Sequence, residues 1–523
     1  MGKYLIKRIL HGLMSIIAVV AIVMLLIYSL MNRDLIFAMD GNFTKVNNNQ
    51  KTAYKYRKWE EYGYIDYMTY ADFLQELVDS GEITNETRER VAPFGSTEAK
   101  DKAETTEYLN KFKQYCEDNG FEYKRLDAVY AKGGSLAPGG QAQIFAFRDR
   151  SLFGRLGIYL GNLFQVDNIH NVQEDVGKRG LTFTMRDPAY GGKKISPAII
   201  GNGTNHKYLF YMTNRFPFVH QNLLSISLGK SYVVNQGIDV FTTMTQTQGS
   251  YVLNETYYPT GLVEMSADDL HSAVYARGSL AASKVYQARF TDDYTSVLTN
   301  KAGRSKMGYS FVIGVIASLL AYFLGIPLGA IIARNKGKLV DKIGTGYIIF
   351  IMAVPSLAYI FMIKAIGGMM GLPTTFNMDD LKWVYYVLPV ISLTLRDVGG
   401  LMRWLRRFMI DQMNSDYVKF ARSTGLSENE IFFKHIRKNA IIPIVHGIPG
   451  TFLGAVVGAI VTERVYVVPG AGNMLTRAIN TYDNGVIVGM TLFYAILTVL
   501  SLILGDLLMA TVDPRISFTN KAR

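Results

Sequence analysis

The sequence has a single cysteine, Cys116, among its 523 residues. One thiol excludes an internal disulfide and any metal cage built from several cysteines. Histidine is also scarce, and the seven histidines include no pair three or four residues apart, the spacing that lets one helix face share a metal. No Gly-x-Ser-x-Gly or His-Glu-x-x-His motif occurs. The sequence therefore predicts no metal site and no hydrolytic centre.

Acidic residues are fewer than basic ones, which gives a net charge of +12, but the imbalance is local. Residues 32–306 contain 32 Lys and Arg against 31 Asp and Glu, so nearly all of the excess lies in the rest of the chain, its most apolar part. Basic residues between long apolar runs are typical of loops that border a membrane, whereas a nucleic-acid surface gathers them into a patch. We therefore expect a membrane protein and no nucleic-acid partner.

Six apolar stretches reach, or nearly reach, the roughly 20 helical residues that cross a bilayer. The first is too long for the apolar region of a signal peptide, and no small-x-small cleavage site follows it, so we expect a retained helix. The sequence predicts an α-helical polytopic membrane protein with six transmembrane helices. The stretches are Ile9–Met31, Tyr309–Ala333, Gly344–Ile363, Trp383–Leu401, Ile441–Val461 and Val486–Val512.

Basic residues occupy alternate loops between these stretches. They precede the first, at Lys3, Lys7 and Arg8, and they recur in residues 334–342, 403–438 and 515–523, whereas the intervening loops contain few. Cytoplasmic loops carry the excess of Lys and Arg in membrane proteins. The pattern predicts a multi-pass membrane protein with both termini in the cytoplasm.

Residues 32–306 would then lie outside the cell, and 275 residues are too many for a connector. Helical patterns occur at Tyr70–Val78, which Gly81 closes, and at Ser266–Arg289; the alternating runs Leu181–Met185, Tyr208–Met212 and Ile238–Thr243 favour strands. We therefore expect an inserted extracellular α+β domain between the first helix (1–31) and a five-helix core (307–523). The core contains a cytoplasmic loop at about 402–440.

The segment 416–443, within the longest basic loop, combines two helix signals. A short helix can run from Asp416 to Thr424, with Gly425 where a helix C-terminus reverses. Ser427 and Glu430 have the spacing of a capping box, which starts a second helix. Apolar residues are also unusual in a solvated loop. The apolar residues here are Phe420, Ile431, Phe432 and Phe433. The residues alone leave two interpretations open. The segment is either an amphipathic element that lies on the membrane or on its own helices, or a docking surface for a partner.

Ala421-Arg422-x-x-Gly425-Leu426, followed eighteen residues after the glycine by Pro443, resembles the coupling-loop (EAA) motif of binding-protein-dependent ABC-transporter permeases. The spacing is similar to that of the oligopeptide and dipeptide branch. The resemblance covers residues 1–31 and about 303–523, and a large external insertion is similar to that of Gram-positive oligopeptide permease subunits. Three flanking motifs support it: Gly325-Ile-Pro327-Leu-Gly329, Glu463 with Pro469-Gly470-Ala-Gly472, and Asp513-Pro514-Arg515.

This resemblance implies one half of the translocation pathway of an ATP-driven oligopeptide importer in a bacterial plasma membrane, coupled to separate ATPase subunits through the 417–443 loop. Gly425 would permit a tight turn, Ala421 a close approach, Arg422 a polar contact, and Pro443 a restart of the chain at the membrane. The implied ATPase-coupling residues are Ala421, Arg422, Gly425, Leu426, Ser427, Glu430 and Pro443. The implied partners are a second homologous permease subunit, two ATPase subunits that bind ATP and Mg²⁺, an extracellular peptide-binding lipoprotein, a peptide substrate and the lipid bilayer; this chain would bind no cofactor.

Two charged residues, Arg396 and Asp397, fall inside the fourth apolar stretch. A charge at the bilayer centre costs about 2.5–3.5 kcal/mol on insertion scales, so each needs a partner or water. One hypothesis places both in the peptide pathway. The other lets Arg396 reach the cytoplasmic surface while Asp397 pairs with a neighbouring subunit. For Asp513, Pro514 and Arg515, a structural helix end is favoured over a transport role.

The chain is not expected to hydrolyse ATP. Gly229-Lys230-Ser231 ends like a P-loop, but Leu224 stands where the first glycine must be, and the segment lies outside the cell on this topology. Two alternatives remain: a related permease for dipeptides, nickel or sugars, or a membrane receptor with an external sensing domain. A receptor needs a cytoplasmic output domain, and the longest predicted internal segment has only about 40 residues.

Overall fold

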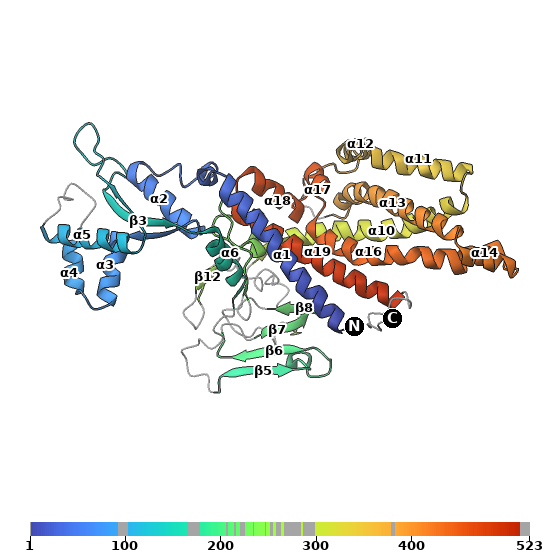
Figure 1. Ribbon diagram of the computed structural model, residues 1–523, viewed down its shortest axis with the longest axis horizontal. Coiled ribbons are helices and arrows are strands. Elements are labelled where there is room, and N and C mark those ends of the chain that lie inside the picture. Colours follow the sequence, from blue (N-terminus) through green and yellow to red (C-terminus); the bar gives the residue numbers. More distant parts are fainter. Residues whose placement is uncertain are drawn as a thin grey trace.

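A computed structural model describes residues 2–92, 103–165, 178–204, 208–213, 216–219, 225–233, 235–245, 247–251, 255–257, 263–265, 284–285, 299–377 and 382–512. Figure 1 shows an elongated molecule, with long helices at one end and a region of mixed helices and strands at the other. The predicted motif Asp513-Pro514-Arg515 and nearly all of the predicted helix Ser266–Arg289 lie outside the described residues.

The helical core is built from long apolar helices. Among the described residues, five are long and apolar enough to cross a membrane, or six if one bent pair counts as a span. Helix α10 packs along α13 and α16, while α19 packs along α16 and α1 (Figure 1). The five helices are α1 (Gly2–Leu30), α10 (Lys306–Arg334), α13 (Val384–Met413), α16 (Arg437–Val457, within the candidate span Glu428–Tyr466) and α19 (Asn484–Val512).

Glycines let α10 approach its neighbours closely. A Cβ on Gly314 would come 2.5 Å from Ala455 Cβ, and one on Gly325 would come 2.9 Å from Leu401 Cβ. Small residues at helix interfaces are the usual means of close packing in a membrane, where no hydrophobic force drives helices together. Part of the Gly325-Ile-Pro327-Leu-Gly329 motif therefore has a packing role between α10 and α13.

The third predicted span, Gly344–Ile363, is not one continuous helix. The chain instead forms α11 (Leu339–Ala353) and α12 (Ser356–Met369), which meet at 107°. Between them, Val354 is extended (ψ 128°) and Pro355 precedes the second helix. Proline disfavours the α conformation in the residue before it and offers no N–H to the preceding turn. The Val354-Pro355 dipeptide therefore breaks the span.

The first part of the inserted region is a sheet covered by helices on both faces. Strands β1 (Ile65–Thr69), β3 (Gln143–Asp149) and β2 (Glu122–Leu126) form an antiparallel sheet in the order β1-β3-β2. Side chains alternate across a strand, so Phe145 and Phe147 of β3 join one hydrophobic cluster while Ile144 and Ala146 join another. The covering helices are α2 (Asn48–Glu61) on one face, and α3 (Tyr70–Asp79), α4 (Asn85–Val91) and α5 (Ala103–Asp118) on the other.

The second part is a four-stranded antiparallel sheet in the order β5-β6-β7-β8, with strands at Gly180–Thr184, Ala198–Asn202, Tyr208–Thr213 and Phe216–Val219. Two of the predicted strands, Leu181–Met185 and Tyr208–Met212, correspond to β5 and β7, and the helix predicted at Tyr70–Val78 is α3. The third, Ile238–Thr243, is wrong because the chain forms helix α7 (Val240–Thr245) there. Its apolar side chains Val240 and Met244, four residues apart, pack into one cluster with α1 and α19.

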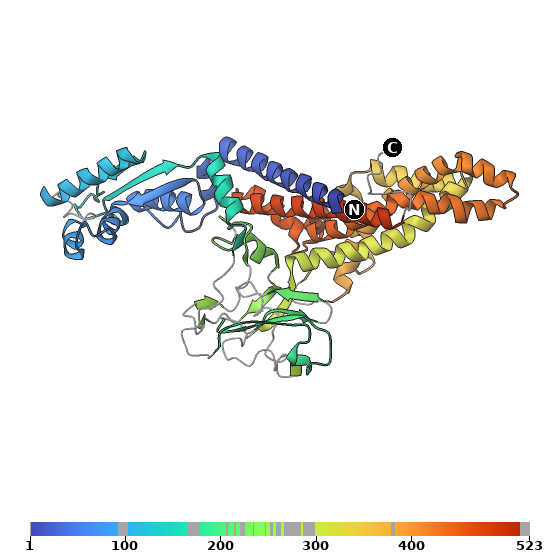
Figure 2. The ribbon, with the colours of Figure 1, turned by 60° about the horizontal axis from the view of Figure 1, so that its bottom comes forward.

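The inserted region is fixed to the core through the segment 225–245. Buried Leu228, Val240 and Met244 share a cluster with Met24 of α1 and Met490 of α19. Glycines in α19 allow this contact, since a Cβ on Gly489 would lie 2.4 Å from the Leu228 carbonyl oxygen. Figure 2 shows the two sheets as separate bodies that leave the helical core in different directions. Helix α6 (Leu152–Gly161) lies near the C-terminal end of α1 (Figure 1).

Candidate functional site

The segment 416–443, called the coupling segment below, forms the expected helix–turn–helix. Helix α14 (Asp416–Ser423) ends at Gly425, whose φ of +83° is a conformation that favours glycine. The second helix starts at Ser427 with the predicted capping box: the Ser427 hydroxyl accepts from the Glu430 N–H, and the Glu430 carboxylate accepts from the Ser427 N–H. The segment lies at the end of the core far from the inserted region (Figure 1).

The apolar residues of the coupling segment divide into two groups. Ile431 and Phe432 are buried in a cluster with α13, and Ala421 is buried in the same cluster. By contrast, Phe420 is 70% exposed and Phe433 is 45% exposed. Inward-facing residues hold the segment on its own helices, and exposed aromatic rings offer surface to a partner. The buried residues therefore agree with an element that packs on its own helices, and docking of a partner on the exposed rings stays a prediction.

The charged residues of the segment lie on its surface and pair locally. Arg422 Nε donates to Glu428 Oε1 (2.7 Å), so in this structure its guanidinium is already engaged within the chain. Lys419 Nζ donates to Asp416 Oδ1 (2.8 Å), and that hydrogen bond lowers the pKa of the exposed Asp416 carboxyl. Arg334, at the end of α10, donates to Asn429 and lies over the rings of Phe432 and Phe433. The segment is thus attached to both α10 and α13.

Pro443 does not restart the chain at the membrane as expected. It lies inside α16 (Arg437–Val457), which continues from the capped turn through a π-helical stretch at Ile431–Ile436. A proline in a helix removes one N–H donor and crowds the preceding turn. The π-type turns at Ile431–Ile436 also interrupt the regular hydrogen-bond pattern, so the second helix of the coupling segment is irregular before it reaches Pro443.

Arg396 and Asp397 both line two neighbouring cavities of about 690 Å³ and 440 Å³ between α10, α12, α13 and α16. Adjacent helix residues point about 100° apart, yet the cavities wrap far enough around α13 to reach both. Neither side chain has a hydrogen-bond or ion-pair partner within the described chain. Polar side chains of Ser356, Tyr359 and Thr451 line both cavities as well. The arrangement offers a positive and a negative group to whatever fills this space.

The motif Glu463-…-Pro469-Gly470-Ala-Gly472 forms a cradle around one buried carboxylate. Glu463 is 1% exposed; its carboxylate accepts from Ser310 Oγ (2.6 Å) and from the N–H groups of Ala459 and Asn473 (both 3.2 Å). A Cβ on Gly470 would lie 2.3 Å from Glu463 Oε2. The glycines are therefore needed because the carboxylate takes the space of a side chain.

The P-loop-like Gly229-Lys230-Ser231 binds a carboxylate of its own chain. Ser231 Oγ donates to Asp483 Oδ2 (2.5 Å), and the Tyr232 N–H donates to Asp483 Oδ1 (2.8 Å). Asp483 is fully buried at the start of α19. This segment therefore joins the inserted region to the core. Within the described residues, no three His, Cys, Asp or Glu side chains come together as metal ligands would.

Comparison with known proteins agrees with this architecture. The family model of the binding-protein-dependent transport system inner membrane component matches residues 325–518. The oligopeptide transport system permease protein AmiC of Streptococcus pneumoniae is 34% identical over 530 aligned residues, which cover 100% of this chain and 99% of that protein.

The chain belongs to the permease subunits of oligopeptide ABC transporters. The match to AmiC runs through the inserted region, whereas other relatives match a smaller share of this permease. Oligopeptide permease AppB of Bacillus subtilis is 30% identical over 230 residues, 41% of this permease and 71% of that protein. Oligopeptide permease OppB of Haemophilus influenzae is 25% identical over 276 residues, 53% of this permease and 85% of that protein.

Among solved structures, the inward-facing MetNI methionine ABC transporter matches with 14% identity and a TM-score of 0.32, covering 40% of this permease and 94% of that chain. Family membership assigns ATP hydrolysis to a separate subunit, so the permease is not itself an enzyme.

Some residues of the permease site were missed by reasoning from sequence. Thr451 and its glycine neighbours line the larger cavity from α16, at Gly447, Gly450 and Gly454. A run of small residues every three to four positions on an apolar helix was the available signal. No comparable signal marked Tyr359 or Ser356, which reach the cavities because α12 bends back after Pro355.

Proposed function

We propose that the permease forms half of the translocation pathway of an ATP-driven oligopeptide importer and receives work from separate ATPase subunits through the coupling segment. The observation that carries the proposal is the exposed aromatic surface of that segment, on a helix–turn–helix that is attached to α10 and α13 from within. A rigid movement imposed on α14 would therefore act on the helices that line the cavities.

The positions of the coupling segment and the inserted region support one orientation of the permease in the membrane. The coupling segment and the inserted region lie at opposite ends of the helical core in both views (Figures 1 and 2). Basic residues are concentrated in the loops on the side of the coupling segment, which favours the cytoplasm for that side and for both termini. The inserted region, residues 32–306, is then extracellular, where it would receive a peptide-binding lipoprotein.

The remaining partners follow from the family and from the open cavities. Half of a pathway needs a second homologous permease subunit to close it, and two coupling segments would take two ATPase subunits, each with ATP and Mg²⁺. The substrate is a peptide, and Arg396 and Asp397 are our candidates for contact with its charged groups. The full-length relative is an oligopeptide permease, which favours this function over nickel, sugar or dipeptide transport and over a receptor.

Gly425→Phe tests the docking role. The residue has φ +83° and open space around it, so the substitution adds backbone strain of about 1 kcal/mol and a ring on the proposed docking surface. We expect peptide uptake and stimulation of the ATPase to be abolished while the protein inserts in the membrane normally. Measurement uses vesicles that hold the complete transporter.

Gly371→Phe is the matched control. Gly371 follows α12, has φ +79° and has no atom within 4 Å of the place that a Cβ would take, so the substitution carries the same conformational cost away from the coupling segment. Uptake should remain near that of the parent protein. Normal transport by Gly425→Phe, or an equal loss in both variants, would refute the docking role.

A further inference from the structure

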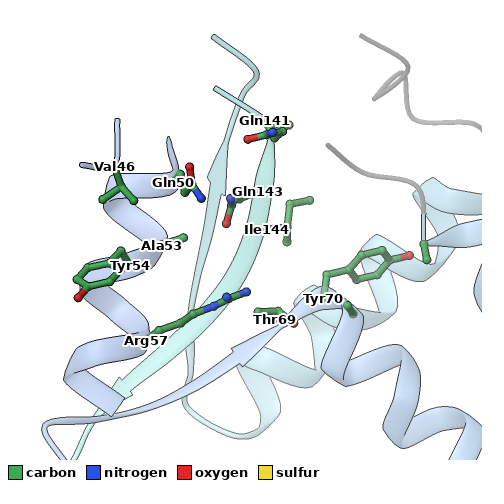
Figure 3. Close-up of a pocket in the computed structure, with 13 residues that line it drawn as sticks. Val46, Gln50, Ala53, Tyr54, Arg57, Thr69, Tyr70, Gln141, Gln143 and Ile144 are labelled. Carbon is green, nitrogen blue, oxygen red and sulfur yellow. The ribbon is translucent and has the colours of Figure 1, made fainter. Parts of the chain in front are cut away.

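A pocket of about 480 Å³ lies in the inserted region, at the place where β1 stops and β3 continues (Figure 3). Strand β1 pairs with β3 only as far as Thr69 opposite Phe145. On its other side, β3 remains paired with β2 two positions further, at Ile144 and Gln143. Within the described chain, no strand pairs with Gln143 or Ile144 on the side of β1. The central strand therefore presents a short free edge to the pocket.

The walls of the pocket are fixed by contacts near the start of α2. The Gln50 N–H donates to the Gly139 carbonyl (2.9 Å), and the buried Asn49 side chain donates to the Gln141 carbonyl (3.0 Å). Gly139 is required there, because a Cβ would lie 2.6 Å from the Asn47 carbonyl oxygen. Because the walls are preformed, ordering the site around a ligand costs little binding free energy.

The lining suits the chemical groups of a peptide. Gln50, Gln141 and Gln143 each carry both a donor and an acceptor, as a peptide backbone does. Arg57 is the one charged side chain among the described residues of the lining, and it is exposed. Figure 3 shows Gln50 and Arg57 reaching from α2 over the pocket, with Arg57 at the end near Thr69. A guanidinium with no acidic neighbour in the lining favours a carboxylate.

We propose that this pocket binds the C-terminal end of a free, extended peptide, which adds to β3 as a short strand in line with β1 and places its carboxylate on Arg57. Addition of a strand to a free sheet edge is a general mode of peptide recognition in which main-chain hydrogen bonds give affinity. The carboxylate distinguishes a free peptide from an internal segment of a partner protein. The site rests on the proposed peptide substrate, but it is separate from the coupling segment and from the cavities of the core.

Binding is tested on the full-length chain in lipid nanodiscs by fluorescence anisotropy. The probe is one N-terminally fluorescein-labelled hexapeptide of alternating Ala and Val, with either a free carboxylate or a C-terminal amide. We expect the amide to bind about ten-fold more weakly, the effect of losing one charge-assisted hydrogen bond. Arg57→Ala should weaken the free acid to the level of the amide, whereas the control Arg90→Ala on α4 should leave the difference intact.

The strand geometry is tested with the same peptide carrying N-methyl groups on either its odd or its even residues. Alternate residues of an added strand direct their N–H groups to β3, so one pattern should lose about ten-fold in affinity and the other should bind nearly as the parent. Equal loss in both patterns, no loss in either, or no binding of the parent peptide overturns the proposal.

The position of the bound peptide is tested by disulfide trapping. Cys116 is the only native cysteine and is buried, so a cysteine introduced at an exposed residue reacts selectively. Gln50→Cys should form a mixed disulfide with a hexapeptide that carries an activated thiol near its middle, and Gln114→Cys on α5 should not. Equal labelling of the two variants contradicts a site at this pocket. The Gly425→Phe variant separates this proposal from the docking role, because it should bind the peptide normally even though it does not transport it.

Discussion

At the coupling end of the core, the ion pairs within the coupling segment lie on the surface and join residues at most six positions apart, as Arg422 and Glu428 do. At the other end, two buried carboxylates bind groups far along the chain: Glu463 binds Ser310, 153 residues away, and Asp483 binds Ser231, 252 residues away. Exposed local pairs contribute little to stability, whereas a buried carboxylate is costly unless all of its partners are present. The comparison separates a surface suited to a partner from a junction that stabilises the chain.

The largest expected effect is that of Glu463→Ala. The variant leaves the buried Ser310 hydroxyl and the partly buried N–H groups of Ala459 and Asn473 without this acceptor, and a fully buried unsatisfied group costs roughly 1–3 kcal/mol. We expect a marked loss of thermal stability in detergent and poor recovery of folded protein. Glu463→Gln keeps the shape and one acceptor and should be much milder. An unchanged Tm for Glu463→Ala would remove the contrast between the two ends.

A smaller effect is expected for Asp483→Ala, which releases the segment 230–233 from the start of α19. Loss of these hydrogen bonds should cost about 2 kcal/mol or more, because the carboxylate is buried. Hydrogen–deuterium exchange at Ser231, Tyr232 and Val233 should become faster, while exchange in α14 stays as it was. Unchanged exchange at these amides would show that the junction does not depend on Asp483.

Arg422→Ala should change function without changing stability. Its guanidinium pairs with Glu428 within the chain, and both side chains are exposed, so the Tm should not move measurably. If the guanidinium also contacts an ATPase subunit, ATPase stimulation should fall several-fold in Arg422→Ala but not in Glu428→Ala. Equal losses in the two variants would mean that ATPase stimulation depends on the Arg422–Glu428 ion pair and not on a contact with the partner.

The smallest effect concerns Asp66, a half-buried carboxylate of the inserted region. Burial raises its pKa, but hydrogen bonds from Arg150 (2.6 Å) and Arg148 (2.9 Å) outweigh burial, so the pKa lies below its usual value. A lowered folded-state pKa contributes stability above the unfolded value of about 3.9, and that stability is lost as pH falls through the folded pKa.

The Tm of the parent protein should therefore fall between about pH 5 and pH 3 by slightly more than that of Asp66→Asn. Circular dichroism melts of both proteins at matched ionic strength make the comparison. Parallel curves would show that this ion pair adds no pH-dependent stability.

The local features of the coupling segment were predictable because they depend on residues a few positions apart. Gly425 ends a helix and Ser427 with Glu430 starts another through contacts within three or four residues. The bend at Pro355 was also present in the sequence, but the apolar run Gly344–Ile363 concealed it. For Ile238–Thr243, the alternating pattern indicated a strand, and packing of Val240 and Met244 against α1 and α19 favoured a helix instead.

By itself, the sequence determined the apolar helices, the basic loops and the helix–turn–helix, since length, hydrophobicity and capping are properties of neighbouring residues. Only the tertiary structure decided what Glu463 and Asp483 bind, that Arg396 and Asp397 share two cavities, and that β3 extends past β1 to leave a free edge. Each of these depends on groups that are far apart along the chain, and their distance is set by packing that no local pattern records.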